Sequence, residues 1–379
     1  MKIISLSLDT LILKKESVVA SRCMRYGNAV ELYTVIVPAQ SKETVLLNDH
    51  TKVYGTGGHF KMVQLWHMYK IASVLLQQKQ CDVITSQDTY FLGFLAWMLS
   101  RKYQCGFEVQ VLGIEKLSFF RKLLSKFVLT RAGSIRVLSN GLQKRLIEEF
   151  GISQTRMMQV PIYVDVSSLG FSTDTLGTEE KKVLDEKNTE FQKKYGGRFN
   201  IVSVNRLVPI KNIAMQLHAI GALCTEFPDI LLHIVGDGPL QSEIETEIEK
   251  LNIAQHVILE GFKSGASLSP FFTQSDCFVL TSNFEGYGMV VIEAATAGLP
   301  IVMTDVGCAG EVIVNEKSGI IVRPGDAKAF TEALKKVIID GSLQEQLHQG
   351  ALQSIAQLPS FDTVLEKYKA SWQQAFNNR

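Results

Sequence analysis

The sequence predicts an α/β protein with two parallel-sheet domains, and three observations carry that prediction. Short β-branched runs alternate with helical patterns through the second half of the 379 residues, as they do in βαβ units. These runs are apolar at consecutive positions, as expected of strands that are covered on both faces. The chain is also long for a single hydrophobic core, which favours two domains.

The strand candidates set the order of the elements. In the second half they are NIVSVNRL (200–207), ILLHIVGDG (230–238), HVILEG (256–261), CFVLTS (277–282), PIVMTD (300–305) and GIIVRP (319–324). In the first half they are 2–8, 29–37, 81–86, 107–113 and 135–140. The glycine-containing run YGTGGHF (54–60) is expected to be a turn, with a role in the cleft as the alternative. Ligands of such sheets bind beyond the carboxyl ends of the strands.

The polar and charged segments suggest where the domains end. We expect an N-terminal Rossmann-like domain at 1–165, a linker with a surface helix at 166–199, and a second Rossmann-like domain at 200–355. An amphipathic helix follows at 356–379. Two open α/β domains of this kind predict a cleft between them.

The composition is that of a folded protein, with 46% apolar and 20% charged residues. The six cysteines are scattered without a C-x-x-C pair, which indicates free thiols in a reducing compartment. The first residues hold too short an apolar run for a signal peptide. The longest apolar stretch, 90–99, is about half the length needed to cross a bilayer. We therefore expect a cytoplasmic protein.

Charge is divided unevenly along the chain. Residues 1–165 carry 21 Lys/Arg against 12 Asp/Glu, or +9, and residues 166–379 carry 18 against 26, or −8. The first half should favour an anionic surface or ligand. Within it, 115–133 is a basic amphipathic segment, which could lie on an anionic membrane or pack its apolar residues on its own sheet. The sequence contains no pattern typical of nucleic-acid recognition, so we do not expect nucleic acid as a partner.

The stretch SNFEGYGMVVIEAATAGLP (282–300) predicts a binding loop. It follows a buried strand and begins a helix, so 286–290 form a helix N-terminus, which binds phosphate through its N–H groups and dipole. Glycines 286 and 288 allow a ligand to approach the backbone closely. Glu285 enters from the loop and Glu293 lies about one turn into the helix, where both could accept hydrogen bonds from hydroxyls. The same spacing of two acids also occurs by chance.

Two cations lie near a second strand end. Arg206 ends the strand at 200–207, and Lys211 opens the next helix. Cations at the carboxyl end of a parallel strand are placed to neutralise a diphosphate and to stabilise charge on a phosphate leaving group. By themselves they could equally be solvated loop cations. The turn VGDGP (235–239) is a weaker signal, because tight strand-to-helix turns use glycine in any case.

Taken together, these segments resemble the retaining glycosyltransferases of the GT-B fold, in particular glycosyltransferase family 4, the group 1 glycosyl transferases. The matching segments are VNRLVPIKN, HIVGDGPL, VILEGF, TSNFEGYGMVVIEAATAGLPIVMTDVGCAGEVI and SGIIVRPGD, in the family's order over about 200–327. The resemblance implies two Rossmann-like domains facing across a cleft, a nucleotide-diphosphate sugar as donor, and no metal or other cofactor. It also implies that the final helix, at 356–379, crosses back to the N-terminal domain.

The resemblance also implies roles for individual residues. Arg206 and Lys211 would hold the donor diphosphate, and Glu285 would contact the transferred sugar. The donor-binding positions would be Gly236, Gly261, Phe262, Gly286, Tyr287, Gly288, Met289, Val290 and Glu293. Of these, Gly261 and Phe262 would meet the base and Glu293 the ribose.

The first half resembles the acceptor domain of the family at 81–93, 135–147 and 160–166. Many members carry a histidine after the strand that matches 107–116, where this sequence has Leu112 followed by Gly113. The Gly-Gly loop that often follows the first strand is absent. His59 or His67 could supply an imidazole instead, or be structural.

We therefore expect a retaining hexosyltransferase of polysaccharide or glycoconjugate biosynthesis, peripheral at the inner face of the cell membrane. It would move a sugar from a UDP- or GDP-linked donor to a glycan or lipid-linked acceptor. Family precedent implies front-face transfer, in which a leaving phosphate oxygen takes the acceptor proton. Two alternatives are a GT-B nucleotide-sugar epimerase and a catalytically silent module that binds nucleotide sugar for another transferase. Leu112 and the missing Gly-Gly loop motivate the silent module.

Overall fold

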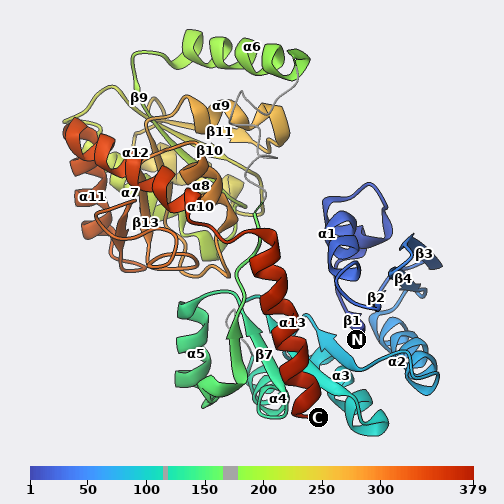
Figure 1. The fold of residues 1–379 in the computed structure, drawn as a ribbon. Coiled ribbons are helices and arrows are strands. Elements are labelled where there is room, and N and C mark those ends of the chain that lie inside the picture. The colour runs from blue at the N-terminus through green and yellow to red at the C-terminus, as the bar shows by residue number, and fades with distance from the viewer. Residues whose placement is uncertain (114–117, 165–177) are drawn as a thin grey trace. The chain divides into compact units, whose positions relative to one another are not determined.

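The computed structural model describes residues 1–113, 118–164 and 178–379 and divides the chain into two compact units (Figure 1). The first unit comprises Met1–Tyr163 together with Pro359–Arg379, and the second comprises Val164–Leu358. Each unit is built on a largely parallel sheet, which confirms the predicted fold class. The second unit is thus inserted in the sequence between two parts of the first.

The first unit holds an eight-stranded sheet in the order β3-β4-β2-β1-β5-β6-β7-β8. Its strands are β1 Lys2–Leu6, β2 Leu32–Val37, β3 Lys42–Asn48, β4 Thr51–Thr56, β5 Val83–Ser86, β6 Gly106–Val111, β7 Ser134–Val137 and β8 Met157–Gln159. Its described helices are α1 Val18–Gly27, α2 Lys61–Gln77, α3 Phe91–Tyr103, α4 Phe119–Leu129, α5 Asn140–Phe150 and α13 Phe361–Asn377, with the 3-10 turns η1 Thr10–Leu13 and η2 Gln154–Arg156. Neighbouring strands are parallel except β3 and β4.

Helices cover both faces of this sheet. The helices α2, α3, α4 and α5 share one core with alternate strand residues such as Ile84. The helices α1 and α13 share the other core with residues such as Val83. Because successive side chains of a strand point to opposite faces, adjacent residues of β5 serve different cores.

A buried ion pair lies between this sheet and α13. Glu108 on β6 and Arg136 on β7 are 0% and 3% exposed, and Nη2 of the arginine lies 3.3 Å from Oε2 of the glutamate. Thr85 donates a hydrogen bond to Oε2 over 2.6 Å, and Ser371 of α13 donates to the other carboxylate oxygen. The guanidinium lies over the ring of Tyr368, 3.7 Å from its centroid. These contacts attach α13 to the sheet.

The edge of the first sheet differs from the sequence prediction. None of the predicted strands covers 42–56, where β3 and β4 form an antiparallel pair. β4 ends at Thr56, inside the predicted turn at 54–60, and 57–60 are not in a strand. β3 is exposed or half-buried throughout and begins with Lys42 and Glu43. An edge strand of this kind lacks the continuous apolar run by which the interior strands were recognised.

The second unit holds a six-stranded parallel sheet in the order β11-β10-β9-β12-β13-β14. Its strands are β9 Phe199–Val204, β10 Ile230–Val235, β11 Val257–Gly261, β12 Cys277–Leu280, β13 Ile301–Thr304 and β14 Ile320–Val322. Its described helices are α6 Thr178–Tyr195, α7 Ile213–Leu223, α8 Gln241–Lys250, α9 Ser269–Thr273, α10 Met289–Thr296, α11 Ala327–Ile339 and α12 Gly341–Ala356, with the 3-10 turns η5 Pro209–Lys211 and η6 Gly265–Ser267. Every residue of β10 is buried, as expected of a strand covered on both faces.

The helix α6 lies within the range 166–199 that we predicted to contain a surface helix, and 165–177 lie outside the described residues. Most of α6 is charged, but Phe191 and Tyr195 are only 5% and 7% exposed. The two rings are one turn apart on the same helix face, and Phe191 meets the ring of Phe271 at 5.5 Å between centroids. This aromatic pair packs α6 against the second unit.

Candidate functional site

The candidate site lies at the carboxyl ends of four neighbouring strands of the second sheet. Because β9, β10, β11 and β12 are parallel, the segments that follow them emerge at one edge. The predicted residues in these segments are Arg206, Lys211, Gly236, Gly261, Phe262, Glu285, Gly286, Tyr287 and Gly288. Open α/β sheets bind their ligands at this edge.

The turn after β10 requires glycine. Gly236 has a φ of 138°, and a Cβ at this position would lie 1.9 Å from the carbonyl oxygen of Asn205. The amide of Gly236 donates to the carbonyl of Gly261 over 2.9 Å, and the amide of Leu207 donates to the carbonyl of Asp237 over 2.7 Å. The segments after β9, β10 and β11 are therefore joined backbone to backbone.

Substituting Gly236 by alanine is expected to destabilise the second unit by roughly 1–3 kcal/mol, the cost of strain at an unfavourable backbone conformation. Gly221 in α7 is the matched control, since its Cβ would meet only Ile253, at 3.8 Å. Gly221→Ala should be neutral or stabilising by up to about 1 kcal/mol. Chemical unfolding followed by circular dichroism compares the two variants, and equal effects would contradict the prediction.

Lys211 and Glu285 form an ion pair at this edge. Nζ of the lysine lies 2.5 Å from Oε1 of the glutamate, and the side chains are 15% and 13% exposed. The hydroxyl of Ser282 donates to the same carboxylate oxygen over 2.7 Å. The two charged residues are 74 positions apart and meet because β9 and β12 are neighbours in the sheet.

Further hydrogen bonds hold the loops after β9 and β12 together. The amide of Asn283 donates to the carbonyl of Ile210 over 2.8 Å. The hydroxyl of Thr281 lies 3.1 Å from the carbonyl oxygen of Lys211, and that of Thr304 donates to the carbonyl of Ser282 over 2.6 Å. None of these hydroxyl residues was among the site residues predicted from the sequence. The spacing of Ser282, three positions before Glu285, was the signal that could have identified one of them.

The helix α10 begins at this edge with an open N-terminus. Its first residue follows Gly288, which has a φ of 83°, and no side chain in the described part of the chain caps it. Met289, Val290 and Gly286 are half-buried around this terminus. Tyr287 is 4% exposed, and burial raises the pKa of its phenol. A ligand here would therefore meet the backbone of Tyr287, while the free N–H groups favour an anion.

Glu293 lies on the second turn of α10 and is half-buried. Burial raises the pKa of its carboxyl group above the ordinary value. A half-buried acid at this distance from the helix start is placed to accept hydrogen bonds from ligand hydroxyls. Its charge costs stability while no ligand is bound.

Glu293→Gln is therefore expected to raise the melting temperature at neutral pH and to leave it unchanged in acid. The folded-state pKa lies above the unfolded-state pKa, so the natural protein loses stability as the pH rises from the ordinary carboxyl pKa through the raised one. Glutamine cannot ionise, so the Glu293→Gln variant does not lose this stability as the pH rises. Thermal unfolding at about pH 4 and about pH 7.5, on either side of this window, measures the effect. A difference of the same size at both pH values would contradict the assignment.

Arg206 and Phe262 are exposed at the same edge. Phe262 is 69% exposed and follows Gly261, whose φ is 67°. An exposed aromatic ring suits stacking on a planar base, and a guanidinium suits a diphosphate. Both side chains are therefore accessible to a ligand of the kind expected.

Leu112 and Gly113 follow β6 in the first unit. Leu112 is 46% exposed and lines a cavity of about 480 Å³, whose wall also includes Asp9, Gln110 and Tyr368. Of the two histidines considered, His67 lies with Nδ1 3.1 Å from the carbonyl oxygen of Gly57. Leu112 therefore occupies the position of the expected histidine, and its side chain lines a cavity of the first unit.

The predicted segment 115–133 contains α4, while 115–117 lie outside the described residues. Val128 and Leu129 are fully buried in the core of the first unit, whereas Phe119 and Phe120 are 87% and 64% exposed. The C-terminal end of α4 therefore packs on the sheet, and its N-terminal end leaves large apolar side chains in contact with solvent.

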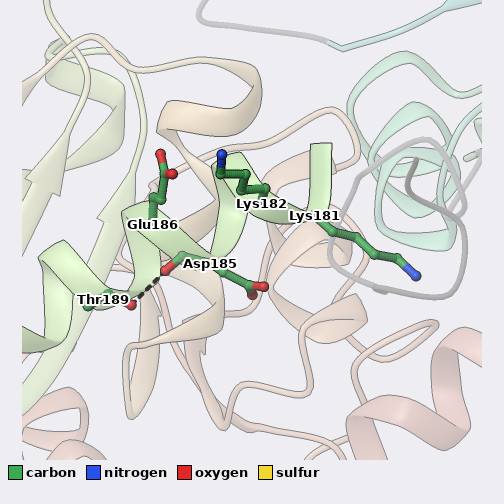
Figure 2. A pocket seen from close by; sticks show the side chains of 5 residues that line it. All are labelled: Lys181, Lys182, Asp185, Glu186 and Thr189. Carbon is green, nitrogen blue, oxygen red and sulfur yellow. Dashed lines mark hydrogen bonds between the residues drawn. The ribbon is translucent and has the colours of Figure 1, made fainter. Parts of the chain in front are cut away.

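A separate hollow of about 540 Å³ lies along α6. Among the residues that the structure describes, five side chains of this one helix line it, and Figure 2 shows them: Lys181, Lys182, Asp185, Glu186 and Thr189. The hydroxyl of Thr189 donates to the carbonyl of Asp185 over 2.8 Å. With two cations and two anions on a single helix face, the hollow suits a diphosphate less well than the strand edge does.

Among the described residues, no three His, Cys, Asp or Glu side chains lie close enough together to hold a metal ion. Within the same ranges, no helix combines the length and the apolar character needed to span a membrane. All six cysteines are free thiols.

Residues 185–354 match the family model of the glycosyl transferases group 1. The capsular polysaccharide biosynthesis glycosyltransferase CapM of Staphylococcus aureus is 25% identical over 287 residues, which is 73% of each chain. A GDP-mannose-dependent alpha-(1-6)-phosphatidylinositol monomannoside mannosyltransferase of Mycolicibacterium smegmatis is 30% identical over 152 residues. That match covers 38% of this chain and 40% of the relative, so the chain matches less than half the length of this relative.

Two solved structures share the fold along the whole chain. The complex of Anabaena Alr3699/HepE with UDP has a TM-score of 0.76 at 17% identity, covering 98% of this chain and 100% of that one. Sucrose-phosphate synthase from Thermosynechococcus elongatus has a TM-score of 0.76 at 15% identity, covering 100% of both chains. These likenesses confirm the predicted GT-B fold. Within the second unit, residues 185–354 are similar to the group 1 glycosyl transferases.

Proposed function

We propose that this protein is a retaining glycosyltransferase of family 4 that moves a sugar from a nucleotide-diphosphate donor to a glycan or lipid-linked acceptor. The observation that carries the proposal is the Lys211–Glu285 pair beside the open N-terminus of α10. A cation, an anion and free backbone N–H groups at one strand edge match the parts of such a donor. The match to the group 1 glycosyl transferases covers the same unit.

The donor diphosphate would lie against Lys211, Arg206 and the N-terminus of α10. Lys211 then lies between two anions, the diphosphate and Glu285. Glu285, oriented by Ser282, would accept hydrogen bonds from hydroxyls of the transferred sugar. Glu293 would do the same for the ribose, and Phe262 would lie against the base.

The reaction exchanges one bond at the anomeric carbon for another on the same face. The bond to the diphosphate oxygen breaks, the bond to the acceptor oxygen forms, and the acceptor proton passes to the departing phosphate oxygen. Lys211, Arg206 and the helix terminus stabilise the charge that develops on the diphosphate. No protein general base and no metal ion is required in this scheme.

The names of similar proteins support the classes of donor and acceptor. The Anabaena structure holds UDP, and the mycobacterial relative is named for GDP-mannose and a phosphatidylinositol mannoside. CapM is named for capsular polysaccharide. We place this protein accordingly in polysaccharide or glycoconjugate synthesis in the cytoplasm, peripheral at the inner face of the cell membrane.

The test is incubation with UDP- and GDP-sugars and a mixture of glycan and polyprenyl-phosphate acceptors. Mass spectrometry identifies the product, and nuclear magnetic resonance identifies its anomeric configuration. We expect one donor to give a product with the configuration of that donor. Inversion would overturn the retaining assignment, and the absence of any product or donor binding would overturn the function.

A second candidate, favoured by Leu112 in place of the family histidine, is a catalytically silent module that binds nucleotide sugar for another transferase. Calorimetry with the same donors separates the two candidates, because binding without product would support the silent module. Conversion of the donor sugar to another sugar without an acceptor would instead indicate an epimerase.

A further inference from the structure

We infer that one face of the first unit, formed by α2, α3 and α4, docks on an anionic lipid bilayer. We call it the α2–α4 face; it comprises these three helices and Phe60, which precedes α2. The inference deepens the membrane part of the proposed function, and it rests on observations in the first unit alone.

The α2–α4 face exposes large apolar side chains. They are Phe60, Met62, Val63, Trp66, Val74, Phe91, Phe94, Met98, Phe119, Phe120 and Leu123. Five of the six exposed phenylalanines in the described part of the chain belong to this set, and only Phe262 lies elsewhere. Such concentrated exposure of apolar rings marks an interaction surface rather than ordinary scatter.

The charges on the same helices have one sign. The helices α2, α3 and α4 contain Lys61, Lys70, Arg101, Lys102, Arg121, Lys122 and Lys126 and no aspartate or glutamate. Two acids from neighbouring segments reach them. Glu149 of α5 lies 3.6 Å from Lys122, and Asp88, just before α3, accepts hydrogen bonds from the amides of Leu92 and Gly93 and interacts with Arg121. Lys61 and Lys126 form no ion pair within the described residues. The face is complementary to an anionic surface.

Contacts between the helices make the face continuous (Figure 1). Trp97 of α3 meets Phe127 of α4 edge to face at 4.7 Å between ring centroids. Lys102 of α3 donates to the hydroxyl of Tyr69 of α2 over 3.0 Å. Exposed rings with adjacent cations are the combination that enters the headgroup region of a bilayer, with the rings at the acyl boundary and the cations at the phosphates.

The position of the rings connects this face with the acceptor side. The helices α2, α3 and α4 follow the parallel strands β4, β5 and β6, so their N-terminal ends lie at the carboxyl edge of the sheet. Phe60, Phe91 and Phe119 stand at those ends. Leu112 lies at the same edge, and the cavity that it lines extends over the other face of the sheet, where α1 and α13 pack. If the acceptor is lipid-linked, as the proposed function states, a docked bilayer would place its headgroup near the carboxyl edge of this sheet, where Leu112 lies.

The test uses the full chain and vesicles of phosphatidylcholine with and without phosphatidylglycerol. One variant, F119S/F120S, removes apolar rings, and another, K61E/K126E, reverses two charges. The matched controls in the second unit are I339S, at a side chain that is 60% exposed, and K328E, at an exposed lysine. Calorimetric titration with UDP and GDP reports on the donor site of every variant.

We expect the natural protein to sediment with anionic vesicles and not with neutral ones, and less so at high salt. K61E/K126E should weaken binding by roughly 30-fold or more, since each cation near an anionic leaflet contributes about fivefold. F119S/F120S should weaken it at least about tenfold. Both controls should bind vesicles like the natural protein.

Equal vesicle binding by the variants and the controls, or no vesicle binding by the natural protein, would overturn the inference. A loss of self-association in F119S/F120S without a loss of vesicle binding would also overturn it, in favour of a contact between copies. Nucleotide binding should be the same in all five proteins. Its absence from all of them, with vesicle binding intact, would refute the proposed function and leave the docking face standing.

Discussion

Lys211→Ala is expected to lower the rate of sugar transfer by one to three orders of magnitude, or roughly 1.4–4 kcal/mol of transition-state stabilisation. The substitution removes the only partly buried cation beside the described N-terminus of α10. It also leaves Glu285 near the diphosphate without its ion-pair partner. The loss should appear mainly in kcat, because charge on the diphosphate is greatest as the sugar departs.

Two comparisons make this result specific. Lys328→Ala, at an exposed position of α11, changes the same net charge and should leave transfer unchanged. Glu285→Gln keeps the shape of the acid and should also lower turnover by one to three orders of magnitude, over roughly the same range of energies. Transfer at the natural rate in both Lys211→Ala and Glu285→Gln would remove this pair from the mechanism.

Arg136→Met is expected to destabilise the first unit by about 3–5 kcal/mol, the usual cost of breaking a buried ion pair by removing one partner. Glu108 would keep its hydrogen bonds from Thr85 and Ser371 but lose its only described cation. All three tryptophans, Trp66, Trp97 and Trp372, belong to the first unit. Their fluorescence during chemical unfolding therefore reports on that unit alone.

The double variant E108Q/R136M serves as the control, since neither charge then remains buried alone. It should recover most of the lost stability. At the surface, Lys144→Met breaks a pair of exposed side chains, Lys144 and Glu148, which are 3.9 Å apart, and should cost no more than about 1 kcal/mol. A double variant as unstable as Arg136→Met would show that the side-chain volumes, and not the charges, matter at this position.

Much of the fold could be predicted because interior parallel strands have a distinct pattern. Runs such as 230–238 and 277–282 are apolar at consecutive positions, and β10 and β12 occupy them. The pattern fails at the sheet edges, where one face of β3 is open to solvent and its residues look like those of a loop. The three-residue strand β8 is too short to carry any period.

The candidate site could be predicted one loop at a time, but the contacts between loops could not. Glycine and charge patterns identified the segments after β9 and β12. They could not show that Lys211 touches Glu285, because that contact depends on the order of the strands in the sheet. β9 and β12 are neighbours, although two other strands separate them in the sequence.

The place of α13 in the first unit has a consequence for how the protein forms in the cell. The first unit contains residues 1–163 and 359–379, so it cannot close until the ribosome has translated the whole second unit. Residues 164–358 are one continuous stretch and can fold first, in keeping with folding by domains during synthesis. Until α13 has been translated, Glu108 lacks its hydrogen bond from Ser371, and Arg136 lacks its contact with the ring of Tyr368. A released chain that ends before residue 361 would thus contain the whole second unit and a first unit that lacks α13.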